Sequence, residues 1–299
     1  MGLDAGLDRF WEAAEAGGLG VDAVEVVADN GPHGERRRIA DIRRDVFSVS
    51  KSVTSLAVGM LVGDGTLSLD DHVVAHLPEL ADTAAAGSEA ITVGHLLRMT
   101  AGNGYRWPDD DGDHPGDPAR DFLATPLVAE PGSTYHYSGG NTYVLGRVVH
   151  AISDLDLRDF LVPRLFGPLS IRNPQWLRCP LGFPLGAIGL QLRTSEINRI
   201  AQLLLHGGTW GSHRLVPGDY IARMTTDTTD TSRAEPDNRT YGLHVWLCAR
   251  DRAWRMDGIY GQFGIVLPGQ HACVSVAGHY QGPTTHILDC VWQHIVPAL

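Results

Sequence analysis

The chain has 299 residues, of which 43% are hydrophobic and 20% charged, a composition typical of a globular protein built as one large domain or two closely packed ones. Its formal net charge of −11 at pH 7 argues against nucleic acid or an anionic membrane surface as the main partner, because both require a basic footprint. The first residues lack a basic segment followed by an apolar core, and no apolar run reaches the ~18 residues of a membrane span. We therefore expect a cytoplasmic protein with no nucleic-acid or membrane partner.

The first part of the chain predicts a helix, two strands and a second helix. Apolar residues recur at helical spacing over residues 3–16, and a group of glycines follows them. Residues 21–27 and 37–42 are predicted to be strands, with a turn at residues 29–32 between them. The second helix is expected to begin close to residue 48.

The last part of the chain is predicted to be rich in strands again. Short aromatic or β-branched segments separated by turns occupy residues 241–249, 254–259, 263–267 and 272–279. A closing helix is expected over residues 285–295.

The middle of the chain has a different character from the two ends. Between about residues 70 and 192, signals for helices, glycine and proline dominate. We therefore predict an α/β (α+β) fold in two regions. Residues 1–70 and 190–299 form the sheet region, residues 71–189 form a mostly helical region, and the active site lies at their interface.

The spacing of metal-ligand residue types predicts no metal site. Cys179, Cys248, Cys273 and Cys290 lie far apart without a Cys-x-x-Cys pair, so we expect free, buried thiols. Histidine pairs at metal-binding spacing with a carboxylate as third ligand are absent from the sequence. No metal and no cofactor are therefore predicted.

The acidic stretch at residues 109–117 (DDDGDHPGD) is the one compositionally biased segment. It lacks the alternation, the glycine position and the closing glutamate of an EF-hand loop, so we interpret it as a solvated loop. A second interpretation is a flap over a pocket, with Tyr105 and Trp107 just before it as substrate contacts. A core position explains the two aromatic residues equally well.

Lys51 is the only lysine in the chain, and it follows Ser48 by three residues in the run 47–55 (FSVSKSVTS). Lysine, unlike arginine, can lose its proton when it is desolvated, so the chain keeps one cation that can become a base. Residues three apart meet on one face of a helix, and the apolar spacing here indicates a partly buried helix. This is the Ser-x-x-Lys arrangement of serine acyl-transfer enzymes, although a solvated serine beside a surface ammonium gives the same pattern.

A second segment supplies groups that such a pair needs for proton transfer. Residues 130–146 (EPGSTYHYSGGNTYVLG) combine a turn signal, the pair Tyr137-Ser138, two glycines and the start of a helical run. Together with residues 47–71, where GDGTLSLDD follows the Ser-x-x-Lys run, this segment resembles the serine β-lactamase-related family. That family contains class C β-lactamases, D-alanyl-D-alanine peptidases, carboxylesterases and nylon-oligomer hydrolases.

Further matches extend this resemblance over nearly the whole chain. Residues 91–102 (ITVGHLLRMTAG), 189–194 (GLQLRT) and 202–210 (QLLLHGGTW) are similar to other segments of the family. The resemblance implies a β-lactamase/penicillin-binding-protein-like fold, in which an antiparallel sheet is flanked by helices and joined to a mostly helical region.

The resemblance also implies roles for four residues. Ser48 matches the nucleophile, Lys51 its proton acceptor, and Tyr137 a partner in proton transfer to the leaving group. Other tyrosines lie nearby, but only Tyr137 stands directly before the Ser-Gly-Gly turn. The backbone N–H of Ile259 is expected to pair with that of Ser48 as the oxyanion hole.

The third motif of the family, a strand that carries Lys-Thr-Gly or a relative, matches residues 256–262 (MDGIYGQ). This version is similar to that of esterase and nylon-hydrolase members, which have a Gly-x-x-Gly-Gln run there. From this strand and from the tyrosine motif we predict substrate contacts by Asp257, Gly258, Tyr260, Gln262, Ser138 and Asn141.

Two departures from the family pattern restrict the expected substrates. Met256 and Asp257 stand where β-lactam-recognising members have lysine and threonine, and an ionised Asp257 facing the pocket would repel a carboxylate by about 1–4 kcal/mol. Gly139 stands where the family's Tyr-x-Asn motif has asparagine, and whether Asn141 replaces it is left open. We therefore expect neutral esters or amides to react faster than penicillins or cephalosporins.

The sequence thus predicts a serine hydrolase that cleaves an ester or amide bond of a small molecule through an acyl-enzyme intermediate. Three alternatives stay open. They are a β-lactamase or D-amino-acid peptidase, an acyltransferase of secondary metabolism, and a non-catalytic ligand-binding or sensor protein on the same fold.

Overall fold

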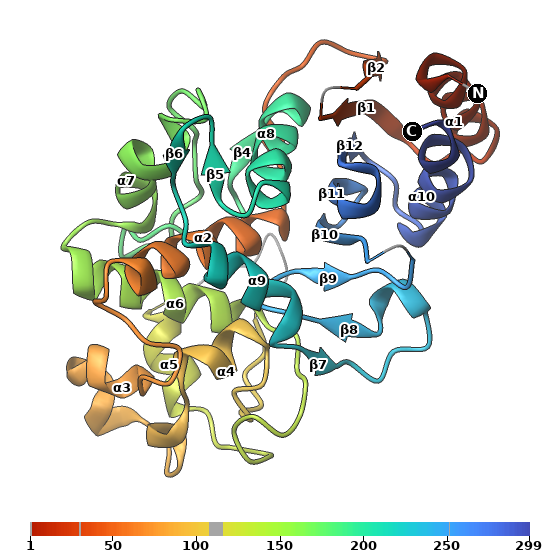
Figure 1. Cartoon of the computed structure of the whole chain (residues 1–299). Helices are drawn as coiled ribbons and strands as arrows, with labels where there is room; N and C mark the ends of the chain where they lie inside the picture. The colour runs from red at the N-terminus through yellow and green to blue at the C-terminus, as the bar shows by residue number, and fades with distance from the viewer. Residues whose placement is uncertain (1, 30, 108–115, 251) are drawn as a thin grey trace.

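The computed structural model describes residues 2–29, 31–107, 116–250 and 252–299. Its main sheet contains eight strands in the order β2-β1-β12-β11-β10-β9-β8-β7, with antiparallel pairing between the neighbours. The start of the chain pairs with its end at β1 and β12, so the two termini lie close together (Figure 1). The strands are β1 (Val21–Ala28), β2 (His33–Arg37), β7 (Thr229–Asp230), β8 (Thr240–Tyr241), β9 (Trp246–Leu247), β10 (Trp254–Gly258), β11 (Gln262–Leu267) and β12 (Ala272–Gly278).

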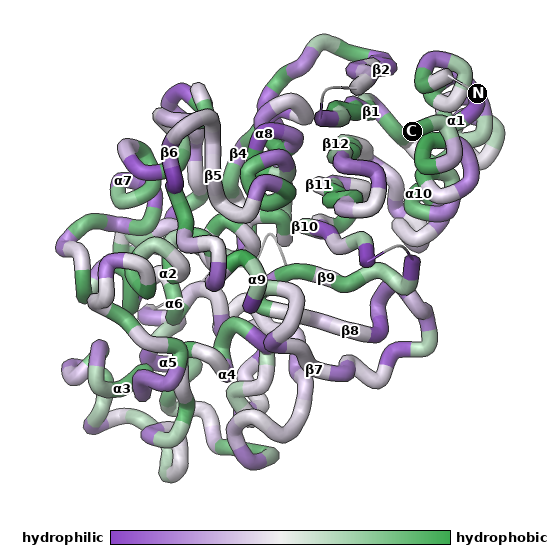
Figure 2. The backbone as a smooth tube through the Cα atoms, in the orientation of Figure 1, coloured by the Kyte–Doolittle hydropathy of each residue, from purple (hydrophilic) through white to green (hydrophobic). Residues whose placement is uncertain are grey.

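Helices cover both faces of this sheet. α1 (Leu3–Ala16) and α10 (Thr285–Cys290) lie together on one face, and α8 (Thr194–Leu205) lies on the other (Figure 1). The central strands β11 and β12 are buried along their whole length. Because both of their faces are covered, these strands are apolar at most positions instead of alternating with polar residues (Figure 2).

A second group of helices packs around α2 (Val49–Gly63). Every residue of α2 from Val49 to Leu61 is buried, so this helix forms the centre of the group. α6 (Gly139–Ser153), α7 (Leu157–Leu161) and α9 (Gly218–Thr226) contact this helix, and α3 (Val73–His76), α4 (Val93–Leu97) and α5 (Pro118–Ala124) pack against α6. Two small strand pairs complete the framework, β3 (Arg44–Asp45) with β4 (Gln191–Leu192) and β5 (Thr209–Trp210) with β6 (His213–Arg214).

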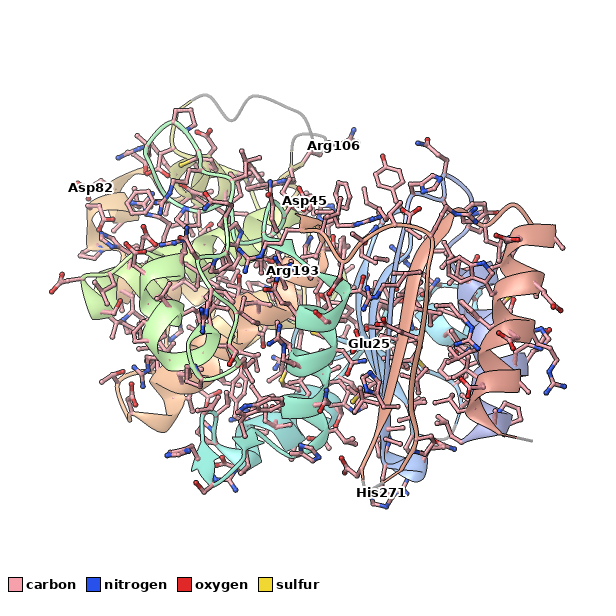
Figure 3. All side chains as sticks on the ribbon, turned by 90° about the horizontal axis from the view of Figure 1, so that it is seen from above. Glu25, Asp45, Asp82, Arg106, Arg193 and His271 are labelled. Atoms are coloured by element: carbon pink, nitrogen blue, oxygen red, sulfur yellow. The ribbon has the colours of Figure 1, made fainter. Side chains whose placement is uncertain are left out.

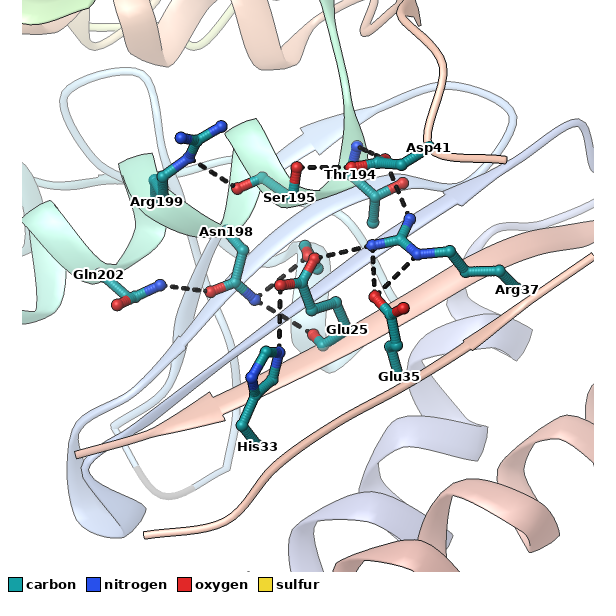
Figure 4. Close-up of polar contacts among 11 residues, drawn as sticks. Glu25, His33, Glu35, Arg37, Asp41, Thr194, Ser195, Asn198, Arg199 and Gln202 are labelled. Carbon is teal, nitrogen blue, oxygen red and sulfur yellow. Dashed lines mark hydrogen bonds and ion pairs between the residues drawn. The ribbon is translucent and has the colours of Figure 1, made fainter. Parts of the chain in front are cut away.

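A polar network joins α8 to the first strands of the sheet (Figure 4). Arg37 of β2 contacts the Glu25 carboxylate of β1 at 3.0 Å and the Asp41 carboxylate at 2.9 Å. Asp41 in turn accepts a hydrogen bond from the Ser195 hydroxyl, and Asn198 donates to the Glu25 carbonyl oxygen at 3.1 Å. Burial raises the pKa of Glu25 even though Arg37 opposes this shift. The network fixes α8 against the sheet through paired groups, as buried charges require.

One predicted strand is wrong. β2 covers His33–Arg37, whereas residues 38–42, the larger part of the segment predicted at 37–42, are not in a strand, and only the Arg38 N–H among their described backbone groups donates a hydrogen bond to β1, at 2.8 Å to the Asp22 carbonyl oxygen. β1 pairs with β2 from Val27 opposite His33 to Ala23 opposite Arg37, so only the first two residues of β1 lie beyond the last pair. Ile39 and Ile42 favoured the strand prediction by residue type, but their side chains are exposed.

A second predicted strand, residues 241–249, is a hairpin. β8 ends at Tyr241 and β9 begins at Trp246, and these two residues pair across the turn. His244 in the turn has a positive φ of 61°, which a continuous strand does not allow. The strands predicted at 254–259, 263–267 and 272–279 are confirmed as β10, β11 and β12.

The expected free thiols are present: Cys179 and Cys273 are buried, and Cys248 and Cys290 are half-buried. The closing helix predicted at 285–295 is present as α10 and a following π-helical turn, Val291–Ile295. In the part of the chain that the structure describes, none of the helices has both the length and the hydropathy needed to cross a membrane.

Candidate active site

Ser48 and Lys51 meet at the start of α2. Ser48 immediately precedes the helix, and Lys51 lies in its first turn. The Lys51 Nζ donates a hydrogen bond to Ser48 Oγ at 2.8 Å and another to the Ala187 carbonyl oxygen at 3.1 Å. Lys51 is only 3% exposed. The helix therefore brings the two side chains together, as their spacing predicts.

The turn that presents Ser48 contains an unusual backbone conformation at Phe47, whose φ is 45°. Bulky residues rarely adopt this left-handed conformation, so surrounding contacts must stabilise it. Asp45 Oδ1 accepts hydrogen bonds from the N–H groups of Phe47 at 2.6 Å and Gly189 at 3.1 Å. The Phe47 ring packs edge-on against Tyr260, 5.1 Å between centroids. Seen from above, Asp45 lies where the chain passes from the sheet to the helical group (Figure 3).

Tyr137 reaches the same place from the segment that precedes α6. Ser138 caps this helix, because its Oγ accepts a hydrogen bond from the Gly140 N–H at 3.3 Å. The Lys51 Nζ lies 4.9 Å from the centroid of the Tyr137 ring, and the same ring packs against Trp246 at 6.0 Å. The cap thus fixes Tyr137 beside the amine.

These side chains border a cavity of about 210 Å³. The cavity is lined by Ser48, Tyr137, Arg233, Asn238, Trp246, Asp257, Ile259 and Thr284. Sequence reasoning missed Arg233, Asn238, Trp246 and Thr284. Arg233 and Asn238 come from the connection between β7 and β8, and Thr284 immediately precedes α10, so no local motif marks them. Trp246 offered a weak signal as an aromatic residue in a predicted strand.

The connection between β10 and β11 carries Ile259 to this cavity. Gly258, the last residue of β10, pairs with Gln262 across the turn. A Cβ atom at Gly258 would lie 2.4 Å from the Val46 carbonyl oxygen, so this close approach requires glycine. The strand thus lies directly against the segment that leads to Ser48, and both Ser48 and Ile259 line one cavity.

Tyr260 and Gln262 are placed in a separate cavity of about 280 Å³, which Phe47 also lines. Gln262 is 1% exposed, and its Nε2 donates a hydrogen bond to the Gly278 carbonyl oxygen at 2.7 Å. Its side chain therefore supports the sheet where β11 meets the end of β12.

The strand β10 turns Asp257 towards the cavity and Met256 away from it. Met256 is fully buried, and a Cβ atom at Gly264 would lie 2.3 Å from its Cε. Neighbouring residues of a strand face opposite sides, so the expectation that both residues replace a substrate-binding pair is wrong for Met256.

Asp257 does not face the cavity as an isolated negative charge. Its Oδ2 accepts a hydrogen bond from Arg255 Nε at 2.8 Å, and Arg255 is fully buried. Burial raises the pKa of Asp257 although Arg255 and Arg233 oppose this shift. The repulsion of a substrate carboxylate expected from the sequence is therefore largely cancelled by the neighbouring guanidinium.

Tyr105 and Trp107 pack against the first turn of α6. Cβ atoms at Gly139 and Gly140 would lie 2.6 Å from the rings of Trp107 and Tyr105, respectively. The Trp107 ring therefore takes the space that a side chain at position 139 would need. Both aromatic residues border the core around α2, and the described lining of the Ser48 cavity does not include them. The packing supports their core interpretation over substrate contact, and residues 109–115 of the acidic stretch lie outside the described residues.

Asn141 is 2% exposed in the first turn of α6. Its Nδ2 donates a hydrogen bond to the Ser138 carbonyl oxygen at 3.2 Å, while its Oδ1 is buried without a hydrogen-bond partner among the described residues. Neither Asn141 nor Ser138 is among the described residues that line the Ser48 cavity. Both support the start of the helix that follows Tyr137.

His244 is a buried neighbour of Lys51 that sequence reasoning missed. It is 2% exposed, and its Nε2 lies 3.0 Å from the Thr142 Oγ1. Burial lowers the pKa of His244 to about 3, and the charge of Lys51 acts in the same direction. Ser52 donates a hydrogen bond to the His244 carbonyl oxygen at 2.6 Å, which joins the β8–β9 turn to α2.

Comparisons with solved structures support the fold class predicted from the sequence. A D-stereospecific amidohydrolase from Streptomyces sp. superposes with a TM-score of 0.75 at 20% identity, covering 95% of this chain and 97% of that one. A penicillin-binding protein from Bacillus halodurans superposes with a TM-score of 0.71 at 16% identity, covering 95% and 99%. The β-lactamase/penicillin-binding-protein-like fold is thereby confirmed.

Sequence comparison gives the family. Esterase EstB of Burkholderia gladioli is 34% identical over 201 residues, which cover 57% of this chain and 51% of EstB. The chain thus spans about half the length of this curated relative. The profile of the Beta-lactamase family matches residues 14–289, nearly the whole chain. With its antiparallel sheet, helical group and Ser48–Lys51 pair, the chain belongs to the Beta-lactamase family.

Proposed function

We propose that the protein is a serine hydrolase that cleaves an ester or amide bond through an acyl-enzyme intermediate. The observation that carries this proposal is the 2.8 Å hydrogen bond between Lys51 Nζ and Ser48 Oγ at the edge of a cavity. A hydroxyl becomes an effective nucleophile when a base within hydrogen-bond reach takes its proton. Burial disfavours the charged form of an amine, so the environment of Lys51 suits a base.

In the first half of the reaction, Ser48 Oγ attacks the substrate carbonyl carbon and passes its proton to the neutral Lys51 amine. The N–H groups of Ser48 and Ile259 are the proposed donors to the developing oxyanion. The bond to the leaving alcohol or amine then breaks, and Tyr137 relays the proton from Lys51 to the leaving atom. In the second half a water attacks the carbonyl carbon of the acyl-enzyme and gives a proton to Lys51. The bond between the acyl group and Ser48 Oγ then breaks, Lys51 returns this proton to Ser48 Oγ, and the acid is released.

The names of one sequence relative and one structural neighbour support this assignment at the level of reaction class. EstB is named an esterase and the Streptomyces protein an amidohydrolase, and both names describe hydrolysis at a carbonyl carbon. The position of Tyr137 supports its proposed role, because it lines the cavity together with Ser48 and its ring lies beside the Lys51 amine.

The test is covalent labelling by a fluorophosphonate probe, read by intact mass, combined with hydrolysis of a short activated ester. Ser48→Ala is expected to abolish labelling and to lower kcat by more than about 10³-fold, since the covalent step is lost. Ser50→Ala is the matched control, because Ser50 is buried and its Oγ accepts a hydrogen bond from the Leu190 N–H. This control should be labelled like the wild type.

Labelling of Ser48→Ala at the wild-type rate would show that the nucleophile is a different residue. A wild-type protein that is neither labelled nor active on esters and amides would support the non-catalytic alternative.

A further inference from the structure

Asp45 connects the turn before Ser48 with a second segment of the chain. It is half-buried, and its Oδ1 accepts hydrogen bonds from the Phe47 N–H at 2.6 Å and from the Gly189 N–H at 3.1 Å. Phe47 immediately precedes Ser48 in the sequence. Hydrogen bonds to an ionised carboxylate are stronger than those between neutral groups, so this one side chain can hold both segments.

The second segment supports the base. Gly189 follows Ala187 by two residues, and the Ala187 carbonyl oxygen accepts a hydrogen bond from Lys51 Nζ at 3.1 Å. A neutral amine that donates one N–H to this oxygen can direct its lone pair towards the Ser48 hydroxyl. One Asp45 oxygen therefore links the support of the nucleophile to the support of the base.

Both N–H donors to Asp45 belong to residues with a left-handed backbone. The φ angle is 45° at Phe47 and 85° at Gly189. A Cβ atom at Gly189 would lie 2.4 Å from the Leu177 Cβ, so this close approach requires glycine. Strained conformations such as that of Phe47 persist only where surrounding contacts determine them. The Asp45 carboxylate supplies such a contact at both positions.

The backbone of Asp45 is held independently of its side chain. Asp45 pairs with Gln191 where β3 meets β4, and the next residue, Val46, donates its N–H to the Leu190 carbonyl oxygen at 2.9 Å. Removal of the carboxylate should therefore loosen the two turns that it contacts, while the strand pair keeps its place.

We propose that Asp45 is a positioning residue that keeps Ser48 and the oxygen acceptor of Lys51 in register. The described lining of the Ser48 cavity does not include Asp45, so it acts through the backbone and does not touch the substrate. Because the Ser48 N–H is one of the proposed oxyanion donors, a displaced turn would move the nucleophile and this donor together. The inference rests on the proposed function.

The first test is Asp45→Ala, measured on a short activated ester. A displacement of reacting groups by about 1 Å can cost about 10²-fold, so we expect kcat to fall about 10²-fold while KM stays within about twofold of the wild type. The rate of fluorophosphonate labelling should fall as well, because the probe reacts with the same Ser48 hydroxyl. Near-normal kcat and labelling in a folded alanine variant would refute the positioning role.

Asp45→Asn separates the hydrogen bonds from the charge. The amide oxygen of asparagine can accept both backbone hydrogen bonds, although neutral bonds are weaker. We expect kcat at least about tenfold above that of the alanine variant, and within about tenfold of the wild type. An asparagine variant that unfolds at the wild-type temperature but loses about 10²-fold in kcat would show that the charge is required, and would overturn the proposal even if the alanine variant does not fold.

Asp41→Ala is the matched control. The Asp41 carboxylate also accepts a backbone hydrogen bond, from the Thr194 N–H at 3.0 Å, and it pairs with Arg37, but these contacts fix α8 to the sheet. The control should lower the melting temperature and leave kcat close to the wild-type value. A loss of kcat as large as that of Asp45→Ala would mean that general loosening explains both variants, and would also overturn the proposal.

The wild type distinguishes failure of this inference from failure of the proposed function. A wild-type protein without turnover and without labelling that depends on Ser48 would refute the proposed function itself. An active wild type with an equally active Asp45→Ala variant would refute only the role of Asp45.

Discussion

The Ser48 cavity has two sides of different character. We call the side that carries Ser48 and Lys51 the helical wall, and the side that carries Arg233 and Asn238 the sheet wall. The helical wall is enclosed and held by hydrogen bonds, whereas the sheet wall is open to solvent. Lys51 is 3% exposed and bonded to two oxygen atoms. Arg233 is exposed, and its guanidinium lies over the Trp246 ring. The first wall is built by helices around α2, and the second by the connection between β7 and β8.

This difference separates two tasks within one small cavity. Bond making requires reacting atoms held to fractions of an ångström, which rigid helices and buried hydrogen bonds supply. Selectivity is commonly carried by loops on a rigid scaffold. Substitutions in the helical wall should therefore lower kcat for every substrate, whereas substitutions in the sheet wall should change the ranking of substrates.

The largest effect is expected for Lys51→Arg. Arginine keeps the positive charge but cannot act as a base, so kcat should fall about 10²- to 10⁴-fold for charged and neutral esters alike. Lys51→Met, which removes the charge and keeps a similar length, should be equally damaging. Steady-state kinetics on one neutral and one negatively charged activated ester, together with thermal unfolding to confirm the fold, measure this. Near-normal activity of the arginine variant would show that charge alone is required and would end the general-base role.

The fold was largely predictable because its main elements follow local patterns. The helix at Leu3–Ala16 and the strands β10, β11 and β12 were expected from periodicity and residue type. The errors occurred where tertiary pairing decides: residues 38–42 find no partner strand because β1 ends, and a turn with His244 at positive φ divides one predicted strand into two.

The helical wall was more predictable than the sheet wall for the same reason. Ser48 and Lys51 lie on one helix, so their spacing alone predicts contact. Arg233 reaches the cavity through long-range folding of an irregular connection, which no local pattern encodes. The pairing of Asp257 with Arg255 was accessible in principle, since residues two apart on a strand share a face.

A medium effect, on stability, is expected for His244→Asn behind the helical wall. Burial keeps the pKa of His244 at about 3, below the ~6.5 of an unfolded histidine. The unfolded chain then binds more protons between these two values, so the free energy of unfolding falls as the pH drops through this window. One such proton gives a slope of up to ~1.4 kcal/mol per pH unit. Asparagine tolerates positive φ and does not titrate, so it should flatten the slope between about pH 6 and 4.

Urea unfolding at a series of pH values measures this slope. His213→Asn, which changes an exposed histidine, is the control. An unchanged slope in His244→Asn would mean that the imidazole is not held neutral in the folded protein. A lower free energy of unfolding at pH 7 would indicate lost packing around position 244, which is separate from the titration of the imidazole.

The smallest effect is expected for Thr284→Val in the sheet wall. Valine keeps the shape of threonine and removes the hydroxyl, which makes no capping hydrogen bond to α10. A neutral hydrogen bond contributes about 0.5–1.5 kcal/mol, so kcat/KM for a substrate that accepts a hydrogen bond from this hydroxyl should fall roughly 2- to 10-fold relative to a substrate that does not. The melting temperature should stay close to that of the wild type, because the half-buried Thr284 side chain makes no hydrogen bond within the part of the chain that the structure describes.

Removal of one hydroxyl from the helical wall should instead lower the free energy of unfolding and leave the substrate selectivity unchanged. Ser52 is 1% exposed and bonded to the His244 carbonyl oxygen at 2.6 Å, so Ser52→Ala leaves a buried acceptor unpaired. We expect about 1–3 kcal/mol of lost stability with an unchanged ratio of kcat/KM between these two substrates. Should Thr284→Val lower stability while Ser52→Ala alters selectivity, the two walls would not divide the tasks, and Thr284 would be a structural residue instead of a contact to the substrate.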